Sequence, residues 1–303
     1  MTVDVPPFAS GLLDRDAATR MSEDGLLAAW ADPAARVLRL HGLEIPVFGD
    51  GAHGLGLVLA ETDGRYAPAR EDGSIGHVYL GRRDGAPVFA ELAAETTVLP
   101  DGAEWMHPFQ AGARLSQIDR ELVAVASALL RWHEAAAFSP RDGAATLAVQ
   151  GGWARHDASG SEFFPRTDPA VIVLIEHENR VLLGSNTLWE TGRFSLLAGF
   201  VEAGESLEQA VIREVFEESG VRLGAVEYQA SQPWPFPRSL MIGFRARLAP
   251  GADPDDLVPD PTEISELRWF SRDQVRTPDP GITLPAGTSI ARWLLDRWVA
   301  EGD

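Results

Sequence analysis

The sequence predicts a protein that combines helices and strands, an α/β (α+β) fold, in more than one domain. The chain has 303 residues, which is longer than most single domains, and 45% of them are hydrophobic, enough for a sizeable core. Short apolar runs between Gly/Asp turns dominate the first third, whereas strand-like runs alternate with helical patterns after residue 167. This change of pattern divides the chain into segments 1–98, 99–137, 138–166 and 167–303.

Residues 1–98 are expected to form a smaller mixed α/β domain. Strands are predicted for three apolar runs, at 36–40, 55–60 and 87–92. Tight turns are predicted between them, at 49–51 (GDG), 62–64 (TDG) and 84–85 (DG). Because this segment offers no catalytic group of residues, we expect it to act as a scaffold or in dimerisation.

The middle of the chain predicts a helical connector, 99–137, followed by a segment rich in glycine and small residues, 138–166. A helix is expected over 115–137, with Ser116 as its N-cap. The helix prediction depends on apolar residues at three- and four-residue steps, namely Ile118, Leu122, Ala126, Leu129 and Trp132.

From residue 167 the pattern is that of an α/β domain. Two strands, 170–175 and 180–183, are expected to form a hairpin through residues 176–179. A helix is expected over 206–219 and another near the C-terminus, over 289–299. Further strands are expected at 227–230, 240–248 and 266–270.

The composition excludes several kinds of chemistry. Cysteine is absent, so there is no disulfide and no thiolate nucleophile, and all 26 basic residues are arginine, which excludes a Schiff-base or P-loop lysine. The net charge of −19 argues against extended nucleic-acid binding, although divalent cations can reverse the local sign. With no signal peptide and no apolar run long enough for a membrane span, we expect a cytoplasmic protein that does not bind membranes.

A cluster of carboxylates is predicted on the helix over 206–219. Glu214, Glu217 and Glu218 have the spacing i, i+3 and i+4, which places them on one face, where they repel one another. Mg²⁺ or Mn²⁺ would offset that repulsion, since both prefer oxygen ligands. Glu205 can pair with Arg213. The opposite face is expected to pack on a sheet through Leu207, Ala210, Val211, Val215 and Phe216.

The whole segment 199–221, GFVEAGESLEQAVIREVFEESGV, resembles the signature of the Nudix hydrolases at every fixed position. The resemblance implies a mixed sheet sandwiched between helices and hydrolysis of a nucleoside diphosphate linked to another moiety. It makes Glu214 and Glu218 the principal metal ligands and Glu217 a ligand or the base that activates water. Arg213 and Glu205 complete the implied catalytic set.

A stiff segment rich in proline and aromatic residues follows, 231–239, SQPWPFPRS. Each proline fixes its own φ and pushes the preceding residue into an extended conformation, so the segment is expected to be a non-helical loop. Two interpretations stay open from the residues alone. The rings of Trp234 and Phe236 can bind a ligand, or they can cover the hydrophobic core.

Together with the Nudix signature, SQPWPFP resembles the NADH pyrophosphatase (NAD-capped RNA hydrolase-like) subgroup. This resemblance implies metal ligation by the Ala198 carbonyl, Glu214, Glu217, Glu218 and Glu263. It also implies base or nicotinamide stacking on Phe164 and Phe200, and a backbone contact at Ala291. The implied dinucleotide site is lined by Gln232, Pro233, Trp234, Pro235, Phe236, Pro237, Arg238 and Ser239.

Relatives in this subgroup carry a zinc ribbon that this chain has lost. The four positions equivalent to the zinc-binding cysteines are Ser139, Asp142, His156 and Ser159. This set is poor in the thiolates and imidazoles that zinc prefers. We therefore expect no zinc, and a degenerate metal-free hairpin that packs around Phe138, Trp153 and Phe163.

The resemblance leads to a specific functional hypothesis. We expect metal-dependent hydrolysis of NAD(H) to AMP and nicotinamide mononucleotide by a homodimer, with the 231–239 loop setting the preference for a dinucleotide. One alternative is a Nudix hydrolase of ADP-ribose or of the NAD cap of RNA. Another, from a different class, is an inactive nucleotide sensor.

Overall fold

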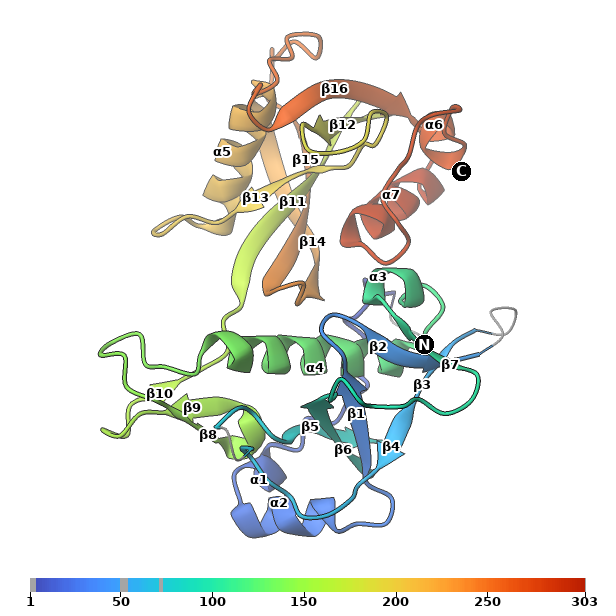
Figure 1. The fold of residues 1–303 in the computed structure, drawn as a ribbon. Helices are drawn as coiled ribbons and strands as arrows, with labels where there is room; N and C mark the ends of the chain where they lie inside the picture. The colour runs from blue at the N-terminus through green and yellow to red at the C-terminus, as the bar shows by residue number, and fades with distance from the viewer. Residues whose placement is uncertain (1–3, 50–53, 71–72, 303) are drawn as a thin grey trace. The chain divides into compact units, whose positions relative to one another are not determined.

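The computed structural model describes residues 4–49, 54–70 and 73–302, and the chain divides into two compact units (Figure 1). The N-terminal unit comprises Phe8–Thr167 together with Trp234–Arg238. The C-terminal unit has three parts, namely Asp168–Pro233, the chain from Ser239 onward and the N-terminal segment that ends at Pro7. The four expected segments stay a prediction; the first three, 1–98, 99–137 and 138–166, fall within the N-terminal unit from Phe8 onward.

The N-terminal unit contains two small sheets and a long helix. One sheet has the order β4-β1-β6-β5 and the other the order β3-β2-β7. The strands are β1 (Arg36–Leu40), β2 (Ile45–Phe48), β3 (Gly56–Leu57), β4 (Leu59–Glu61), β5 (Val78–Arg83), β6 (Ala86–Leu92) and β7 (Ala103–Met106). The helices are α1 (Ala17–Arg20), α2 (Glu23–Trp30), α3 (Pro108–Ala111) and α4 (Gln117–Ala135).

Most of the local expectations for this unit are confirmed. β1 and β6 match the predicted strands, and the chain turns between β5 and β6 at Asp84 and Gly85, both with positive φ. The apolar run at 55–60 is divided between two short strands, β3 and β4, that pair with different sheets. The turn expected at 49–51 lies outside the described residues beyond Gly49.

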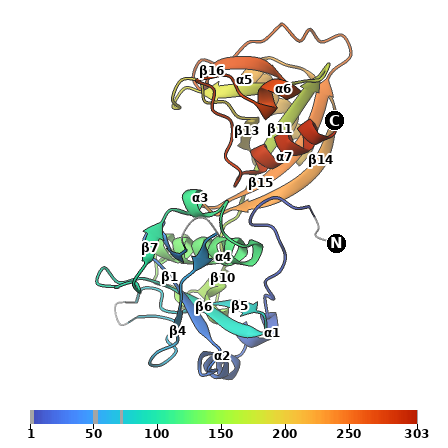
Figure 2. The ribbon, with the colours of Figure 1, turned by 90° about the vertical axis from the view of Figure 1, so that its right-hand side faces the viewer.

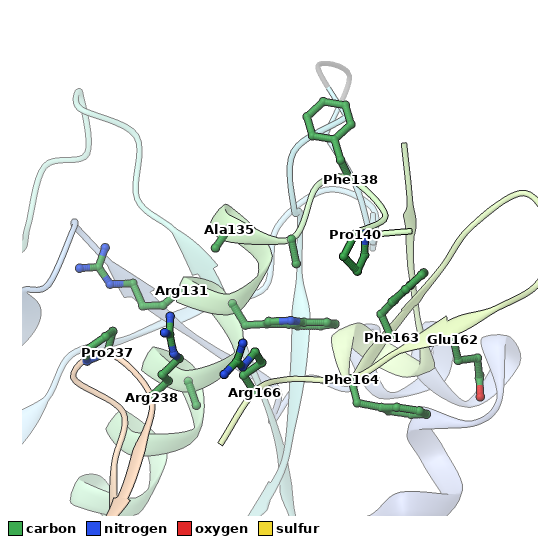
Figure 3. A pocket seen from close by; sticks show the side chains of 13 residues that line it. Arg131, Ala135, Phe138, Pro140, Glu162, Phe163, Phe164, Arg166, Pro237 and Arg238 are labelled. Carbon is green, nitrogen blue, oxygen red and sulfur yellow. The ribbon is translucent and has the colours of Figure 1, made fainter. Parts of the chain in front are cut away.

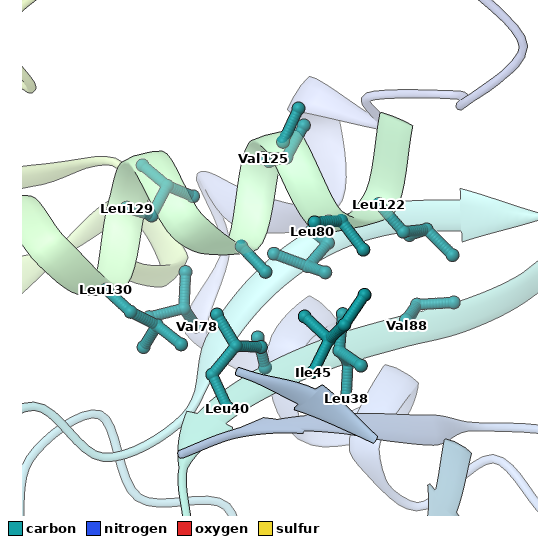
Figure 4. Close-up of a cluster of buried hydrophobic side chains, with 14 of the residues drawn as sticks. Leu38, Leu40, Ile45, Val78, Leu80, Val88, Leu122, Val125, Leu129 and Leu130 are labelled. Carbon is teal, nitrogen blue, oxygen red and sulfur yellow. The ribbon is translucent and has the colours of Figure 1, made fainter. Parts of the chain in front are cut away.

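Helix α4 covers the sheets and forms the centre of the core of this unit (Figure 4). Its N-cap is Ser116, as predicted, whose Oγ accepts a hydrogen bond from the Asp119 amide at 3.2 Å. At the C-terminal end of the helix the buried face contains His133. Trp132, which the sequence pattern places on that face, is only half-buried. The side chains that α4 packs against β1, β2 and β5 include Leu122, Val125, Leu129 and Leu130.

The segment 138–166 forms a three-stranded antiparallel sheet, β10-β9-β8, and a short 3-10 turn. Its strands are β8 (Leu147–Val149), β9 (Ala154–His156) and β10 (Glu162–Phe163). At its base the buried Arg155 guanidinium donates to the Thr146 hydroxyl at 2.6 Å and to the Thr146 carbonyl at 2.7 Å. These bonds link β9 to the residue before β8, in addition to the backbone pairing of the three strands.

His133 completes that network in its neutral form. Its Nε2 donates to the Gly152 carbonyl at 2.8 Å, and its Nδ1 accepts from Arg155 at 2.8 Å. Burial lowers the pKa of His133 to about 4. A neutral ring with one donor and one acceptor satisfies both partners, which a charged ring cannot do.

The four positions equivalent to zinc ligands all make local hydrogen bonds. Ser139 Oγ accepts from the Arg141 amide at 3.2 Å, and Asp142 Oδ1 accepts from the Ala144 amide at 3.0 Å. His156 Nδ1 donates to the Asp157 carbonyl at 2.9 Å, and Ser159 Oγ donates to the Asp157 carboxylate at 2.6 Å. Phe138, expected to pack inside this segment, is 66% exposed, so that expectation is wrong.

The C-terminal unit is built on a six-stranded mixed sheet. The strand order is β14-β15-β11-β12-β16, with β13 also paired to β11, and β11 and β15 run parallel. The strands are β11 (Asp168–His177), β12 (Arg180–Asn186), β13 (Leu197–Phe200), β14 (Leu223–Trp234), β15 (Ser239–Leu248) and β16 (Ile264–Ser271). The helices are α5 (Leu207–Ser219), α6 (Arg272–Arg276) and α7 (Ile290–Ala300).

Helices cover both faces of this sheet, as the sequence predicts. Alternate residues of β11 point to opposite faces, so Val171 and Val173 pack with α5 while Ile172 and Leu174 pack with α7. Figure 2 shows α7 in front of the sheet. The β11–β12 hairpin is tighter than expected, because β11 continues to His177 and the turn is made by Glu178 and Asn179 alone.

The helices of the described ranges include none with the length and apolar character needed to span a membrane.

Candidate functional site

Helix α5 carries the carboxylates, and its two ends are fixed by its own sequence. At the start, Ser206 Oγ accepts from the Gln209 amide at 3.2 Å, while the Gln209 side chain accepts from the Ser206 amide at 2.8 Å. This reciprocal pair is a capping box. At the end, Gly220 takes a left-handed conformation with φ of 72°, the conformation that glycine commonly takes where a helix ends.

Arg213 links the loop before α5 to the acidic face of the helix. Its Nε and Nη2 donate to the two oxygens of Glu205 at 2.6 and 2.8 Å, which confirms the predicted pair. Nη2 also donates to the Phe200 carbonyl at 3.0 Å, and Nη1 lies 3.1 Å from Glu217 and 2.9 Å from Glu214. The hydrogen bonds from Arg213 lower the pKa of Glu205 to about 2.

Gly199 leaves space for the Glu214 carboxylate beside β13. A Cβ atom at position 199 would lie only 2.0 Å from Cδ of Glu214 and 2.1–2.2 Å from its oxygens. Any side chain there would therefore displace the carboxylate. The glycine that begins the Nudix signature thus sets the position of one of its acidic residues.

Glu218 is the most buried carboxylate of the group. Glu218 is only 6% exposed, and its Oε2 accepts a hydrogen bond from the Ala198 amide at 3.2 Å. Burial, with the negative charges of Glu214 and Glu263, raises the pKa of Glu218 to about 8. Burial also raises the pKa of Glu214, and Glu263 contributes to that shift. Burial and the neighbouring negative charges therefore both disfavour the ionised forms of Glu214 and Glu218.

Two further acidic residues lie at the exposed edge of this group. The Glu217 side chain is 57% exposed and contacts Arg213. Glu263 is exposed in the segment before β16, where its carbonyl accepts from the Thr187 amide at 2.8 Å. The sequence places Glu263 about fifty residues from α5, so the fold of the sheet, rather than helical spacing, brings its charge near Glu218.

The face of α5 that contacts the sheet is narrower than expected. Ala210, Val211 and Val215 are buried, as predicted, but Phe216 is 50% exposed, so its assignment to the packing face is wrong. Phe216 lies one turn after Ile212, which is also half exposed. The two define a separate apolar stripe beside the carboxylates.

The donor chemistry of this site fits a hard divalent cation. Carboxylate oxygens and a backbone carbonyl are the ligands that Mg²⁺ and Mn²⁺ prefer. Across residues 4–49, 54–70 and 73–302, no three acidic or histidine side chains are grouped as a complete set of metal ligands. Glu214 Oε1 and Glu217 Oε2 contact Arg213, and the second oxygen of each carboxylate lies outside these ion pairs.

Gln232, expected to contact the dinucleotide, is fully buried and bonded to protein. Its Nε2 donates to the carbonyls of Pro7 and Thr288 at 2.8 and 2.9 Å, and its Oε1 accepts from the Ile290 amide at 2.7 Å. These bonds hold the N-terminus of α7. Ala291, the residue after Ile290, is buried and 3% exposed, so the backbone contact that the resemblance implies stays a prediction.

Trp234 and Phe236 belong to an aromatic cluster in the N-terminal unit. Trp234 stacks on Phe109 with ring centroids 4.9 Å apart, and Phe236 meets Phe109 and Phe8 edge to face at 5.1 and 5.9 Å. The structure thus favours the interpretation that these rings cover a core. Pro233 and Trp234 end strand β14 and Ser239 begins β15, so the loop is only the tip of this hairpin.

The remaining predicted residues lie at exposed positions. Phe164 is 57% exposed and Phe200, at the end of β13, is 58% exposed. Phe164, Pro237 and Arg238 line one cavity of the N-terminal unit (Figure 3). The cavity is also lined by Arg131 and Trp132, which the sequence did not indicate, because the helical pattern assigned Trp132 to the core face of α4.

Comparison with known proteins identifies the family. A model described as "NUDIX domain" matches residues 166–291, and one described as "NADH pyrophosphatase-like rudimentary NUDIX domain" matches residues 51–132. The chain is 40% identical over 301 residues to the NAD-capped RNA hydrolase NudC of Mycobacterium bovis (strain BCG / Pasteur 1173P2), covering 94% of this chain and 92% of that protein. It is 36% identical over 228 residues to the protein of the same name from Pseudomonas syringae pv. tomato (strain ATCC BAA-871 / DC3000), covering 73% and 76%.

A solved structure of a NUDIX hydrolase from Nitrosomonas europaea aligns with 54% of this chain and 90% of its own length, at 25% identity and a TM-score of 0.44. The sequence identity to the mycobacterial protein extends over nearly all of both chains, and the two family models match both halves of this one. The expected resemblance and fold are confirmed. The chain belongs to the Nudix hydrolases, in the group that carries an NADH pyrophosphatase-like domain before the Nudix domain.

Proposed function

We propose that this hydrolase cleaves the diphosphate bond of NAD(H), giving AMP and nicotinamide mononucleotide, with Mg²⁺ or Mn²⁺ as cofactor. The observation that carries the proposal is the position of Glu214 and Glu218 against β13, where Gly199 makes room for the Glu214 carboxylate and the Ala198 amide donates to Glu218. After burial, the negative charge of Glu263 also helps to raise the pKa of both helix carboxylates. The name of the mycobacterial relative, NAD-capped RNA hydrolase, supports an NAD-containing substrate.

Each residue of the site has a distinct proposed task. Glu214, Glu218, Glu263 and the Ala198 carbonyl would hold the cations, with Glu217 as a further ligand or as the base. Bound cations neutralise the diphosphate and lower the pKa of a coordinated water. Arg213 ties the preceding loop to α5 and holds the acidic side chains in place.

Glu217 is the best placed of the three helix carboxylates to accept a proton. It is the most exposed of them, with its side chain 57% exposed against 14% for Glu214 and with Glu218 buried. Phe200, whose ring is 58% exposed at the end of β13, is proposed to stack on a base or on nicotinamide. Stacking of this kind contributes about 1–3 kcal/mol per base.

The NAD cap of an RNA chain is the second candidate substrate. It contains the same diphosphate, and the relatives from Mycobacterium bovis and Pseudomonas syringae are named for this activity. The carboxylate group contacts only what the two substrates share, so it supports both equally. The homodimer and the cytoplasmic location expected from the sequence stay predictions.

We also propose that the 138–166 segment folds without zinc. Ser139, Asp142, His156 and Ser159 already use their side chains in local hydrogen bonds, and Arg155 crosslinks the base of the sheet. Elemental analysis should find less than one zinc per chain, and EDTA should leave the melting temperature unchanged. A stoichiometric zinc, or unfolding by EDTA, would contradict this.

The activity is tested on the purified full chain with NADH, NAD⁺, ADP-ribose and an NAD-capped oligoribonucleotide. Each substrate is incubated with Mg²⁺, Mn²⁺ or EDTA, and the products are separated by chromatography. We expect AMP and reduced nicotinamide mononucleotide from NADH, and no product in EDTA. Hydrolysis of ADP-ribose without hydrolysis of any NAD-containing substrate would refute the proposal.

A further inference from the structure

The segment 249–263, which connects β15 to β16, is attached to the end of the carboxylate helix α5 by backbone hydrogen bonds. The Val258 amide donates to the Ser219 carbonyl at 2.9 Å, and the Asp260 amide donates to the Glu218 carbonyl at 3.4 Å. The last carbonyls of a helix have no partner within the helix, so these bonds satisfy two of them. They also fix the start of the turn that leads to Glu263.

Asp260 holds that turn with its side chain and with its backbone. Its Oδ1 accepts from the amide and from the hydroxyl of Thr262, both at 2.8 Å. Its carbonyl accepts from the Glu263 amide at 3.2 Å and from the Ile264 amide at 2.8 Å. An aspartate that bonds the backbone two residues later is a common way of fixing a turn. The backbone that carries Glu263 is therefore set by four hydrogen bonds to one residue.

Thr187, just after β12, holds the same turn from the opposite side. Its amide donates to the Glu263 carbonyl at 2.8 Å, and its Oγ1 donates to the Thr262 carbonyl at 3.1 Å. Among the residues that the structure describes, the Glu263 carboxylate makes no hydrogen bond or ion pair of its own. Its position therefore depends on how firmly the backbone beneath it is held.

We propose that Asp260 is a positioning residue, whose turn places the Glu263 carboxylate beside Glu214 and Glu218 so that the three can share a divalent cation. The proposal rests on the proposed function, which makes Glu263 a metal ligand. In this role Asp260 acts through Glu263 and not through its own charge. Loss of a residue that orients a metal ligand typically costs 10- to 100-fold in metal affinity.

The same segment contains a matched control. Residues 253–255 (DPD) repeat the arrangement of residues 260–262 (DPT), with the Asp255 amide donating to Asp253 Oδ1 at 2.9 Å. Asp253→Ala therefore removes the same kind of bond and the same charge from the same segment. It leaves the turn before Glu263 intact.

Two further variants separate the geometry of Asp260 from its charge. Asp260→Asn keeps an oxygen that can accept from Thr262 but loses the negative charge. Asp260→Glu keeps the charge, but its longer side chain cannot close the same turn. Melting temperatures identify the variants that fold, and Asp260→Glu decides the question if Asp260→Ala does not.

Hydrogen–deuterium exchange in EDTA, followed by mass spectrometry, first measures how firmly the backbone is held. Asp260→Ala and Asp260→Glu should speed exchange in peptides that cover residues 262–264, because the amides there lose protection when the turn opens. Asp260→Asn and Asp253→Ala should exchange there as the wild type does. Wild-type exchange in folded Asp260→Ala or Asp260→Glu would overturn the proposal.

Binding of Mn²⁺ without substrate, measured by electron paramagnetic resonance, then tests the consequence for the metal site. Asp260→Ala and Asp260→Glu should raise the Kd for Mn²⁺ roughly 10- to 100-fold, whereas Asp260→Asn and Asp253→Ala should stay close to wild type. In a Glu263→Gln background, Asp260→Ala should have no further effect, because both changes act on one ligand.

Several results would contradict the positioning role. Additive effects of Asp260→Ala and Glu263→Gln, or weak binding by Asp260→Asn with normal binding by Asp260→Glu, would show that Asp260 acts through its own charge. A wild type that binds no Mn²⁺ would overturn both this proposal and the proposed function. A wild type that binds Mn²⁺ with the expected dependence on Asp260, but hydrolyses no NAD-containing substrate, would refute the proposed function alone.

Discussion

Replacing Gly199 by alanine should displace the Glu214 carboxylate while leaving the stability of the fold almost unchanged. The new Cβ would lie 2.0 Å from Glu214 Cδ, whereas ordinary contact begins at 3.4 Å, so the carboxylate must move by at least about 1.4 Å. The backbone at position 199 is not in the left-handed region, so alanine is tolerated there. The atom that must move is the end of a flexible side chain, and the fold should survive.

The expected effect on activity is large because the displaced group is a proposed metal ligand. A misplacement of about 1 Å in a catalytic arrangement can reduce the rate by roughly 100-fold. We therefore expect kcat/KM of Gly199→Ala on NADH to fall by at least about 100-fold, which is ~2.7 kcal/mol of transition-state stabilisation. Alanine restricts the unfolded chain, so the free energy of unfolding should change by less than about 1 kcal/mol.

The assay combines steady-state kinetics with thermal unfolding in the presence of saturating Mg²⁺. Gly287→Ala is the matched control, because a Cβ there meets no atom within 4 Å and the backbone has no positive φ. It should leave both kcat/KM and the melting temperature close to wild type. A folded Gly199→Ala protein with wild-type kcat/KM would show that Glu214 does not act from its place beside β13.

Three other predictions follow from the described contacts. Glu218→Gln removes a ligand charge with little change in volume, so turnover should drop by orders of magnitude while the melting curve shows a folded protein; near wild-type turnover would sink the metal-site assignment. Because burial keeps His133 neutral in the folded protein, the unfolded chain binds a proton at this histidine at a higher pH than the folded chain does. The free energy of unfolding should therefore fall as the pH is lowered from 6.5 to about 4. Urea titrations should show a loss on the order of 3 kcal/mol relative to His133→Gln. The same loss in both proteins would mean that His133 is not the group responsible. Finally, replacing Trp234 and Phe236 together by alanine should destabilise the protein by ~3 kcal/mol or more and lower kcat/KM for NADH and ADP-ribose equally; a loss confined to NADH would instead assign these rings to the nicotinamide end.

Features controlled by local sequence were the ones that could be predicted. The boundaries of α5 follow from Ser206 and Gly220, and the Glu205–Arg213 pair follows from their spacing across a short loop. The same is true of the N-cap of α4 at Ser116. Each of these depends on residues within about ten positions of one another, where backbone geometry leaves few alternatives.

The width of a buried helix face could not be predicted in the same way. Helical periodicity gives the direction of the apolar stripe, but the neighbouring element decides how far around the helix it extends. On α5 the stripe stops before Phe216, and on α4 it passes through His133 instead of Trp132. In both cases an aromatic ring that is only half-buried, Phe216 or Trp132, was assigned to the core, and each ring lines a cavity.

The proline-rich segment shows the limit set by contacts between distant residues. Prolines predict its extended backbone, and the structure continues β14 through Gln232 and Pro233 to Trp234. Its partners, Phe8 and Phe109, are more than a hundred residues away along the chain, so no local pattern could identify them. A stiff aromatic segment is equally suited to binding a ligand and to packing, and only the fold decides.

This outcome changes which aromatic rings are available to select the substrate. Trp234 and Phe236 already contact other rings, so a base would have to displace those contacts to stack on them. Phe164 and Phe200 are both more than half exposed, and covering them with a base would remove apolar surface from water at no loss of existing packing. Because we propose that the carboxylates of α5 act on the diphosphate, which all these substrates share, we expect discrimination between NAD(H), capped RNA and ADP-ribose to depend on these exposed rings rather than on the segment that most clearly marks the subgroup in sequence.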